Sequence, residues 1–272
     1  MHNELNKLEV WLAGVQHNEI FVWIKESLDL LKNTDLSLRY NFCALGLREA
    51  LRIYFDAMSP SNEIESCDWY LMDKDEKARI TRRDRIKYAA YKNIDPRIIM
   101  HGLENSSDKF SKNIDTSIEA IELLCSDYQK LIDKLNKYTH VLGCEDGDVF
   151  ENAALNIVKK FNMINDNIAT ICESVSYIIQ IRIINGIEVD TKYINGSSGT
   201  NNFVIVTHNY NSVEFEVDYD VSLYNPNIKW CAPNINRYKI KGTADGRSLK
   251  INKLTWTVIK SELEDTDIQF KY

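Results

Sequence analysis

The sequence predicts an α+β protein in which an N-terminal all-α helical bundle is followed by a small antiparallel β-sandwich or sheet. Apolar side chains recur every three or four residues from Glu4 to about Arg182, which indicates amphipathic helices. Beyond Arg182, polar and apolar side chains alternate, which indicates strands with one buried face. The length of 272 residues suits two domains. We therefore expect a helical domain over residues 1–183 and a β-rich domain over residues 184–272.

The first part of the helical region contains one strongly marked helix. We expect a helix over residues 18–31 and a second over residues 35–58, with Asp35 as its N-cap and its end before Pro60. The second helix is apolar over a wide arc, so it should lie at the centre of the bundle. Residues 59–80 mix Pro, Asn, Asp, Ser and Lys, which predicts an irregular loop anchored by its aromatic side chains.

Four further helices follow in the helical region. A short basic helix is expected over Thr81–Lys92 with Thr81 as its cap, and another should begin at Asp95, which a proline follows. Two long helices come next, of which the first ends near His140 and the second is capped by Asp148. Because only a short acidic loop over residues 143–147 joins the two long helices, they should form an antiparallel α-hairpin.

The C-terminal region predicts several short strands. Alternating or continuous apolar patterns place strands at residues 187–190, 203–206, 213–219, 238–242 and 249–259. Residues 195–202 are rich in Gly, Ser and Asn and predict a loop, and Asp245-Gly246 is a hairpin-turn signal. Residues 190–272 hold 10 cations and 10 acids, so this region has no charge bias toward nucleic acid.

Composition excludes several classes of protein. The chain has 33 Lys and Arg against 40 Asp and Glu, a net charge of −7, which argues against a surface that coats nucleic acid throughout. No apolar run approaches the roughly 18 residues of a membrane span, and the start lacks a secretory signal, so we expect a cytoplasmic protein. The six cysteines form no CxxC pair, and the sequence has no P-loop, HExxH or GxSxG motif. We expect neither a metal nor a cofactor.

The end of the first long helix holds the first candidate site. Asn136 and His140 are four residues apart and therefore share one helix face, with Lys134 close by. Cutting RNA without a metal requires a group that titrates near neutral pH and donors that stabilise charge on the phosphate, and these residue types supply both. Alternatively, His140 only caps the helix C-terminus, where the dipole and the free carbonyls favour a histidine.

A basic segment provides the second candidate site. Residues 73–92 contain eight cations and four acids, a local charge of +4 in an acidic protein. Arg82, Arg83, Arg85 and Lys87 could hold a phosphate backbone, or they could form a solvated helix face. Trp69 could stack on a base, although an aromatic side chain in a loop more often anchors that loop to the core.

The third candidate site is the pair Arg48-Glu49, which lies on the otherwise apolar helix over residues 35–58 together with Arg39 and Arg52. Charges on such a helix either pair within the bundle or line a cleft, and pairing is the better expectation.

These segments resemble the predicted pPIWI-associating nucleases of bacterial defence islands. In that family, a helix reading R-Y-x-F-x-x-x-G-x-R-E precedes a W-Y element, a T-R-x-x-R-I-K helix and an L-N-K-x-x-H segment. The matching residues here are Arg39–Glu49, Trp69-Tyr70, Thr81–Lys87 and Leu135–His140. The last segment is similar to a degenerate HEPN ribonuclease motif, in which an Arg precedes a polar residue and a His. Here Leu135 stands at the Arg position, so Lys134, Arg48 or an arginine of the basic segment would have to replace that phosphate clamp.

The resemblance implies a HEPN-like helical domain and two alternative functions. The first is an antiphage, metal-independent endoribonuclease that acts on RNA rather than DNA, forms a homodimer and does not bind a membrane. In it, His140 acts as general acid and base, Asn136 orients the phosphate, and Arg48, with its neighbour Glu49, belongs to the catalytic set. The nucleic-acid-binding set is Lys134, Arg82, Arg83, Arg85, Lys87 and Trp69. The second function is a non-catalytic subunit of a defence system that binds a nucleic acid, a ligand or a partner protein.

Overall fold

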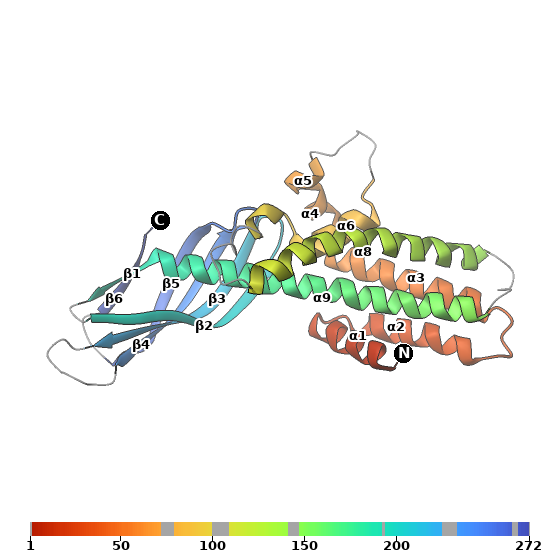
Figure 1. Cartoon of the computed structure of the whole chain (residues 1–272), viewed down its shortest axis with the longest axis horizontal. Helices are drawn as coiled ribbons and strands as arrows, with labels where there is room; N and C mark the ends of the chain where they lie inside the picture. The colour runs from red at the N-terminus through yellow and green to blue at the C-terminus, as the bar shows by residue number, and fades with distance from the viewer. Residues whose placement is uncertain are drawn as a thin grey trace. The chain divides into compact units, whose positions relative to one another are not determined.

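A computed structural model describes residues 2–71, 79–99, 109–140, 147–191, 194–224, 233–262 and 266–271 (Figure 1). The chain divides into two compact units. The first comprises Met1–Tyr91 and Asp115–Ile171, and the second comprises Lys92–Ile114 and Cys172–Tyr272. Helices precede antiparallel strands along the chain, which confirms the predicted α+β class. The expected domain boundary after residue 183 stays a prediction.

The first unit is a helical bundle built around one central helix. Its elements are α1 (His2–Gly14), α2 (Asn18–Asp29), η1 (Leu30–Lys32), α3 (Arg39–Met58), α4 (Ser61–Glu65), α5 (Asp68–Leu71), α6 (Arg82–Tyr91) and parts of α8 (Lys109–His140) and α9 (Gly147–Gly186). Helix α3 buries Tyr54 and Phe55, whose rings pack edge-on against Phe161 of α9 and Tyr128 of α8 respectively. The predicted central position of this helix is confirmed.

The long helices α8 and α9 run antiparallel. Lys160 of α9 pairs with Asp127 of α8 at 3.0 Å, and Phe150 packs on Tyr138 with ring centroids 4.7 Å apart. The later contact on α8 is thus made with the earlier residue of α9, so the two helices are antiparallel, as the predicted hairpin requires. The predicted loop over residues 143–147 lies outside the described residues except for its last member, Gly147, where α9 begins.

The predicted cap of α6 is confirmed. The Thr81 hydroxyl accepts a hydrogen bond from the backbone N–H of Asp84 at 3.2 Å, and the Asp84 carboxylate accepts one from the Thr81 N–H at 2.7 Å. This reciprocal arrangement satisfies two backbone donors that a helix start leaves free. Asp95 caps a short helical turn over residues 96–99, where its carboxylate accepts one backbone hydrogen bond, from the Arg97 N–H at 2.9 Å.

Three predicted boundaries in the helical region were wrong. Helix α3 begins at Arg39 rather than after Asp35, because the Asn33 side chain accepts the Asp35 N–H and holds this stretch in turns. Helix α9 begins at Gly147, so Asp148 lies in its first turn. The predicted loop over residues 59–80 contains α4 and α5. A helix as short as α4 gives no periodic pattern, and it is held by a single fully buried side chain, Ile64.

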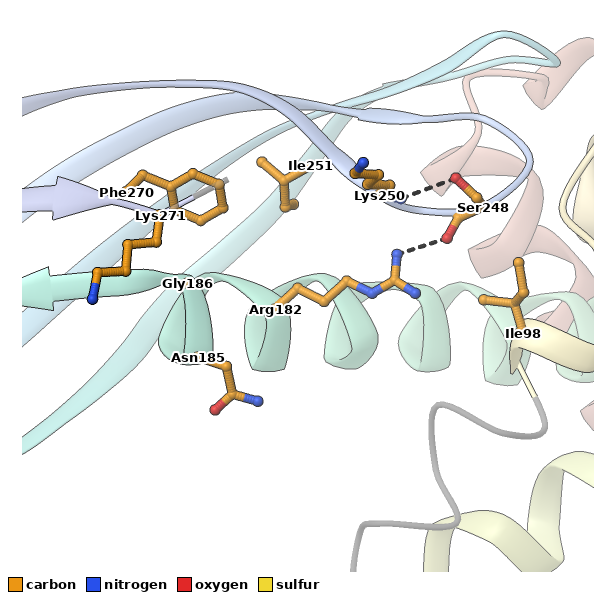
Figure 2. A pocket seen from close by; sticks show the side chains of 9 residues that line it. All are labelled: Ile98, Arg182, Asn185, Gly186, Ser248, Lys250, Ile251, Phe270 and Lys271. Atoms are coloured by element: carbon orange, nitrogen blue, oxygen red, sulfur yellow. Dashed lines mark hydrogen bonds between the residues drawn. The ribbon is translucent and has the colours of Figure 1, made fainter.

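The second unit contains two antiparallel sheets. One is four-stranded, in the order β2 (Ile194–His208), β3 (Ser212–Tyr224), β4 (Asn234–Asp245) and β5 (Ile251–Lys260). The other pairs β1 (Ile187–Thr191) with β6 (Thr266–Phe270). The end of α9 lies beside the turn between β4 and β5, where the Arg182 guanidinium donates to the Ser248 carbonyl at 2.6 Å (Figure 2).

The predicted loop over residues 195–202 was wrong, because this segment belongs to strand β2 and most of its residues pair with β3. The Asn201 amide donates to Asp220 at 3.0 Å, and the Asn202 amide donates to Asp218 at 2.8 Å. These cross-strand bonds and the register shifts along β2 accommodate residues that usually favour turns. The predicted turn at Asp245 is confirmed, since its carboxylate accepts the Ser248 N–H at 2.7 Å.

The two faces of the larger sheet differ in character. Along β3, every second side chain from Val213 to Leu223 is buried, and the side chains between them face the opposite side. On that side, Glu216 pairs with Lys239 at 2.9 Å, and Asp220 pairs with Arg237 at 2.6 Å, both on β4. An acidic strand therefore lies beside a basic strand on the outer face.

Candidate functional site

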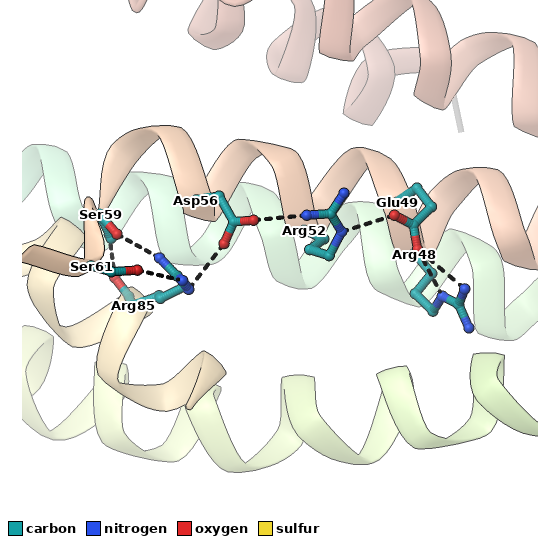
Figure 3. Close-up of polar contacts among 7 residues, drawn as sticks. All are labelled: Arg48, Glu49, Arg52, Asp56, Ser59, Ser61 and Arg85. Atoms are coloured by element: carbon teal, nitrogen blue, oxygen red, sulfur yellow. Dashed lines mark hydrogen bonds and ion pairs between the residues drawn. The ribbon is translucent and has the colours of Figure 1, made fainter. Parts of the chain in front are cut away.

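A chain of ion pairs runs along one side of α3 (Figure 3). Glu49, Arg52 and Asp56 are spaced three and four residues apart, so their side chains meet on the helix surface. Arg52 binds Glu49 at 2.8 Å and Asp56 at 2.9 Å, and Arg48 binds Glu49 at 3.1 Å. The expected pairing is confirmed for Arg48, Glu49 and Arg52, whereas Arg39 donates to the Thr34 carbonyl and the Tyr40 hydroxyl. Hydrogen bonds from Arg52 and then Arg48 lower the pKa of Glu49, which keeps this group ionised.

Helix α6 adds Arg85 to this network. Its guanidinium lies 3.0 Å from Asp56, donates to the Ser59 carbonyl at 2.6 Å and donates to the Ser61 hydroxyl at 3.1 Å. The buried Ser59 hydroxyl in turn donates to the Arg85 carbonyl at 2.6 Å. Arg85 is therefore held at a fixed position between α3 and the start of α4.

A small groove of about 50 Å³ lies between α3, α6 and α8. Its apolar walls come from Leu51, Phe55 and Ile132, and its polar lining consists of Arg48, Arg52, Asp56, Arg82, Arg85 and Tyr128. The groove and the adjoining ion pairs contain four arginines and two carboxylates, Asp56 and Glu49. This network therefore carries two more positive than negative charges. Such an excess of guanidinium groups favours a bound anion.

Two groups in this groove are left with hydrogen-bonding capacity. The Tyr128 side chain is buried, and its hydroxyl has no hydrogen-bond partner among the described residues. Burial raises the pKa of Tyr128 well above its ordinary value, although the charge of Arg82 opposes this effect. The group therefore stays a neutral hydroxyl. Among the residues that the structure describes, Arg82 forms neither a hydrogen bond nor an ion pair. An anionic oxygen in the groove could accept a hydrogen bond from both groups.

Asn136 lies on the face of α8 that lines the groove. Tyr128, Ile132 and Asn136 follow one another at four-residue spacing, which places Asn136 one turn beyond the groove. The side chain of Asn136 is half-buried. The Asn41 amide donates to the Tyr138 carbonyl at 2.6 Å, which ties the end of α8 to the start of α3.

The other residues of the first predicted site separate from this face. Lys134 is exposed and does not line the groove. His140 is the last residue of α8, and its side chain lies outside the part of the chain that the structure describes. The predicted pairing of Asn136 with His140 therefore stays a prediction.

The predicted basic segment does not act as one surface. Arg82 and Arg85 line the groove, whereas Arg83 pairs with Glu122 of α8. The Lys87 ammonium lies 4.6 Å from the centre of the Trp69 ring, which is a cation–π contact. Residues 73–78 of this segment lie outside the described residues.

The sequence alone did not single out Asp56 or Tyr128. The spacing of Glu49, Arg52 and Asp56 was a usable signal, because charges at three- and four-residue intervals mark a connected helix surface. Tyr128 gave no such signal, since a tyrosine at an apolar position of a helix usually belongs to the core.

The described ranges contain no group of three or more His, Cys, Asp or Glu side chains that could hold a metal ion. Cys43 and Cys125 are buried thiols, and burial raises the pKa of Cys43 to about 12, so its thiolate is not accessible near neutral pH. None of the helices that the structure describes has an apolar stretch long enough to cross a membrane.

These features define an α+β protein whose helical unit carries an arginine-lined groove with an excess of positive charge. A family model described as predicted pPIWI-associating nuclease matches residues 22–164, more than half of the chain, and includes every residue that lines the groove. The chain belongs to this family of predicted pPIWI-associating nucleases. No curated protein and no solved structure matches the sequence.

Proposed function

We propose that the protein is a metal-independent endoribonuclease of bacterial antiphage defence, and that the groove between α3, α6 and α8 binds a phosphate of the RNA backbone. The observation that carries this proposal is a groove lined by four arginines and by Tyr128, whose buried hydroxyl has no hydrogen-bond partner among the described residues. Guanidinium groups match the geometry of phosphate oxygens, and a buried hydroxyl without a partner gains a hydrogen bond when an oxygen enters.

The size of the groove limits what enters it. A cavity of about 50 Å³ is much smaller than a typical small-molecule site, so it suits the oxygens of one phosphate and not a whole nucleotide. Arg82 makes the first contact, because it has no competing ion pair among the described side chains. Arg85 keeps its bonds to Asp56 and Ser59 and acts from a fixed position.

Glu49 and Asp56 act as positioning groups in this proposal. Each carboxylate binds two arginines, which orders guanidinium groups that would otherwise repel one another. Because the pKa of Glu49 is lowered, this carboxylate does not carry a proton near neutral pH and is a poor general acid. In this proposal Glu49 positions arginines and does not transfer a proton.

The chemistry assigned to the end of α8 follows from the requirements of RNA cleavage. The 2′-hydroxyl oxygen attacks phosphorus, the bond to the 5′-oxygen breaks, and a 2′,3′-cyclic phosphate forms. A base removes the proton of the 2′-hydroxyl, and an acid gives a proton to the leaving 5′-oxygen. We assign the proton transfers to His140 and the orientation of the phosphate to Asn136, which lies one turn beyond the groove-lining Ile132.

We further propose a homodimer in the cytoplasm, with RNA preferred over DNA, in which each protomer contributes one copy of the Asn136–His140 segment. The description of the family as pPIWI-associating supports a partner protein from the same defence system. Lys134 is exposed and could contact the RNA beyond the groove.

A non-catalytic nucleic-acid-binding subunit is the second candidate function. It is favoured by Leu135, which is fully buried at the position where the HEPN motif has an arginine. A residue packed in the core cannot reach a phosphate, so the clamp of that motif is absent from this position. The groove would then hold RNA for a partner enzyme.

Cleavage assays with purified wild-type protein and the His140→Ala, Asn136→Ala and Arg82→Ala variants test the proposal. Single-stranded and structured RNA are incubated in EDTA and, separately, with Mg²⁺ or Mn²⁺. We expect cleavage in EDTA that His140→Ala abolishes and Arg82→Ala weakens, while the control Arg83→Ala, which removes an arginine paired outside the groove, retains it. Cleavage only with added metal would overturn the metal-independent mechanism. RNA binding without cleavage under every condition would establish the second function.

A further inference from the structure

The second unit contains a large apolar cavity that the proposed nuclease chemistry does not use. It has a volume of about 550 Å³ and lies where the end of α9, the helical turn over residues 96–99, the β4–β5 turn and β6 meet (Figure 2). Ile98, Ile251 and Phe270 form its apolar walls. This volume falls in the range of small-molecule binding sites.

One charged side chain stands in this apolar wall. Arg182 is half-buried, and burial lowers its pKa. Its guanidinium donates to the Ser248 carbonyl at 2.6 Å, and no carboxylate in the described ranges pairs with it. A guanidinium that loses water without gaining an opposite charge is costly, so an anion bound beside it would be stabilised.

The rim of the cavity adds positive charge. Lys250 is exposed and has no ion pair with any residue that the structure describes, while Lys271 pairs with Glu188 of β1. Among the residues that the structure describes, no acidic side chain lines the cavity. The other polar residues of the described lining are Asn185 and Ser248, which offer few groups for hydrogen bonds to the edge of a nucleobase.

We propose that this cavity binds a small amphipathic organic anion, a carboxylate or sulfonate with an apolar body. The anionic group binds Arg182 with support from Lys250, and the apolar body packs against Ile98, Ile251 and Phe270. Gly186 allows the Phe270 ring to form one wall of the cavity, because a Cβ at position 186 would lie 2.3 Å from that ring and would displace it. The site is separate from the proposed RNA-binding groove and does not depend on nuclease activity.

Equilibrium binding of 8-anilinonaphthalene-1-sulfonate, followed by its fluorescence, tests this proposal on the full chain. We expect saturable binding to one site per chain, with decanoate displacing the probe and uncharged decanol of equal chain length displacing it far less. Arg182→Met should weaken binding about ten- to hundredfold, because it removes a charge-assisted hydrogen bond but keeps the length of the side chain. Arg182→Lys should restore part of the affinity.

Two further variants separate binding at the cavity from general loss of structure. Ile98→Trp should fill the cavity and reduce binding, whereas Lys253→Met, which removes an exposed lysine outside the cavity, should leave binding unchanged. Circular dichroism confirms that each variant is folded. Wild-type affinity in folded Arg182→Met and Ile98→Trp would overturn the proposal, as would displacement of the probe by adenosine monophosphate and not by decanoate.

Discussion

Ser59 and Arg85 exchange two hydrogen bonds, one in each direction. The Arg85 guanidinium donates to the Ser59 carbonyl, and the Ser59 hydroxyl donates to the Arg85 carbonyl, both at 2.6 Å. The pair joins the end of α3 to α6, and it holds in place an arginine of the groove. The position of this charge therefore depends on a small, fully buried residue outside the groove lining.

Replacing Ser59 by Ala should lower the free energy of unfolding by about 1–2 kcal/mol, because a buried hydroxyl donor is lost. Urea denaturation measures this change. Ser61→Ala is the matched control, since Ser61 is exposed and accepts a single bond from Arg85, and it should cost less than half as much. Equal losses of unfolding free energy in the two variants would show that the pair of bonds between Ser59 and Arg85 stabilises the fold no more than the single bond from Arg85 to Ser61.

Arg82→Ala should reduce RNA affinity by about 1 kcal/mol, roughly fivefold, because Arg82 is the groove cation with no ion pair among the described residues. The slope of log affinity against log salt concentration should fall by about one phosphate contact. Fluorescence anisotropy with labelled RNA measures both quantities. Arg83→Ala removes an equal charge from the same helix, and if it lowers the slope as much, binding is spread over α6 and not centred on the groove.

Tyr128→Phe should leave the free energy of unfolding within about 0.5 kcal/mol of the wild type, because the hydroxyl that it removes has no hydrogen-bond partner in the part of the chain that the structure describes. The same variant should reduce RNA binding and cleavage, since the hydroxyl is expected to donate to a phosphate oxygen. Tyr54→Phe is the contrast: the Tyr54 hydroxyl accepts from Trp11 at 2.9 Å and donates to Asn165 at 3.2 Å. It should therefore cost about 1–2 kcal/mol. A stability loss in Tyr128→Phe as large as that in Tyr54→Phe would contradict this interpretation.

His208 should make the second unit sensitive to acid. Burial, followed by the nearby charge of Lys92, lowers the pKa of His208 from 6.5 to about 3 in the folded state. Between these values the unfolded chain binds the proton and the folded chain does not, so stability is complete above pH 6.5 and falls as the pH drops toward 3. The slope should be at most about 1.4 kcal/mol per pH unit, the value for one proton.

Denaturant unfolding at several pH values, monitored by a probe in the sheet, measures the effect of His208. His208→Gln should flatten the dependence between pH 6.5 and 4, whereas His2→Gln, a change at an exposed position of α1, should not. An unchanged slope in His208→Gln would assign the acid sensitivity to carboxylates.

The parts of the fold that could be predicted are those with a regular apolar pattern. The period of α3 and the strict alternation of β3 each specify one buried face, and the structure has both. The paired segment of β2 could not be recognised, because Gly, Ser and Asn favour turns locally. Their strand conformation comes from partners on β3, including Asp218 and Asp220, that lie far away in the sequence.

The candidate site was predictable to a similar extent. Arg48, Arg82 and Arg85 were identified from local charge, and the structure brings them to one groove. Local charge could not separate Arg83 and Lys87 from this set, since their partners Glu122 and Trp69 come from other elements. Nor could it identify Tyr128, because whether a buried hydroxyl has a partner is decided by tertiary packing alone.

The paired charges on the outer face of the larger sheet have a consequence at long range. Because acidic side chains of β3 lie directly beside basic side chains of β4, their fields largely cancel and decay faster with distance than the field of an isolated charge. A polyanion approaching this face meets no net attraction. We therefore expect this face of the sheet not to attract RNA electrostatically. The arginines of the helical unit should provide the attraction for the nucleic acid.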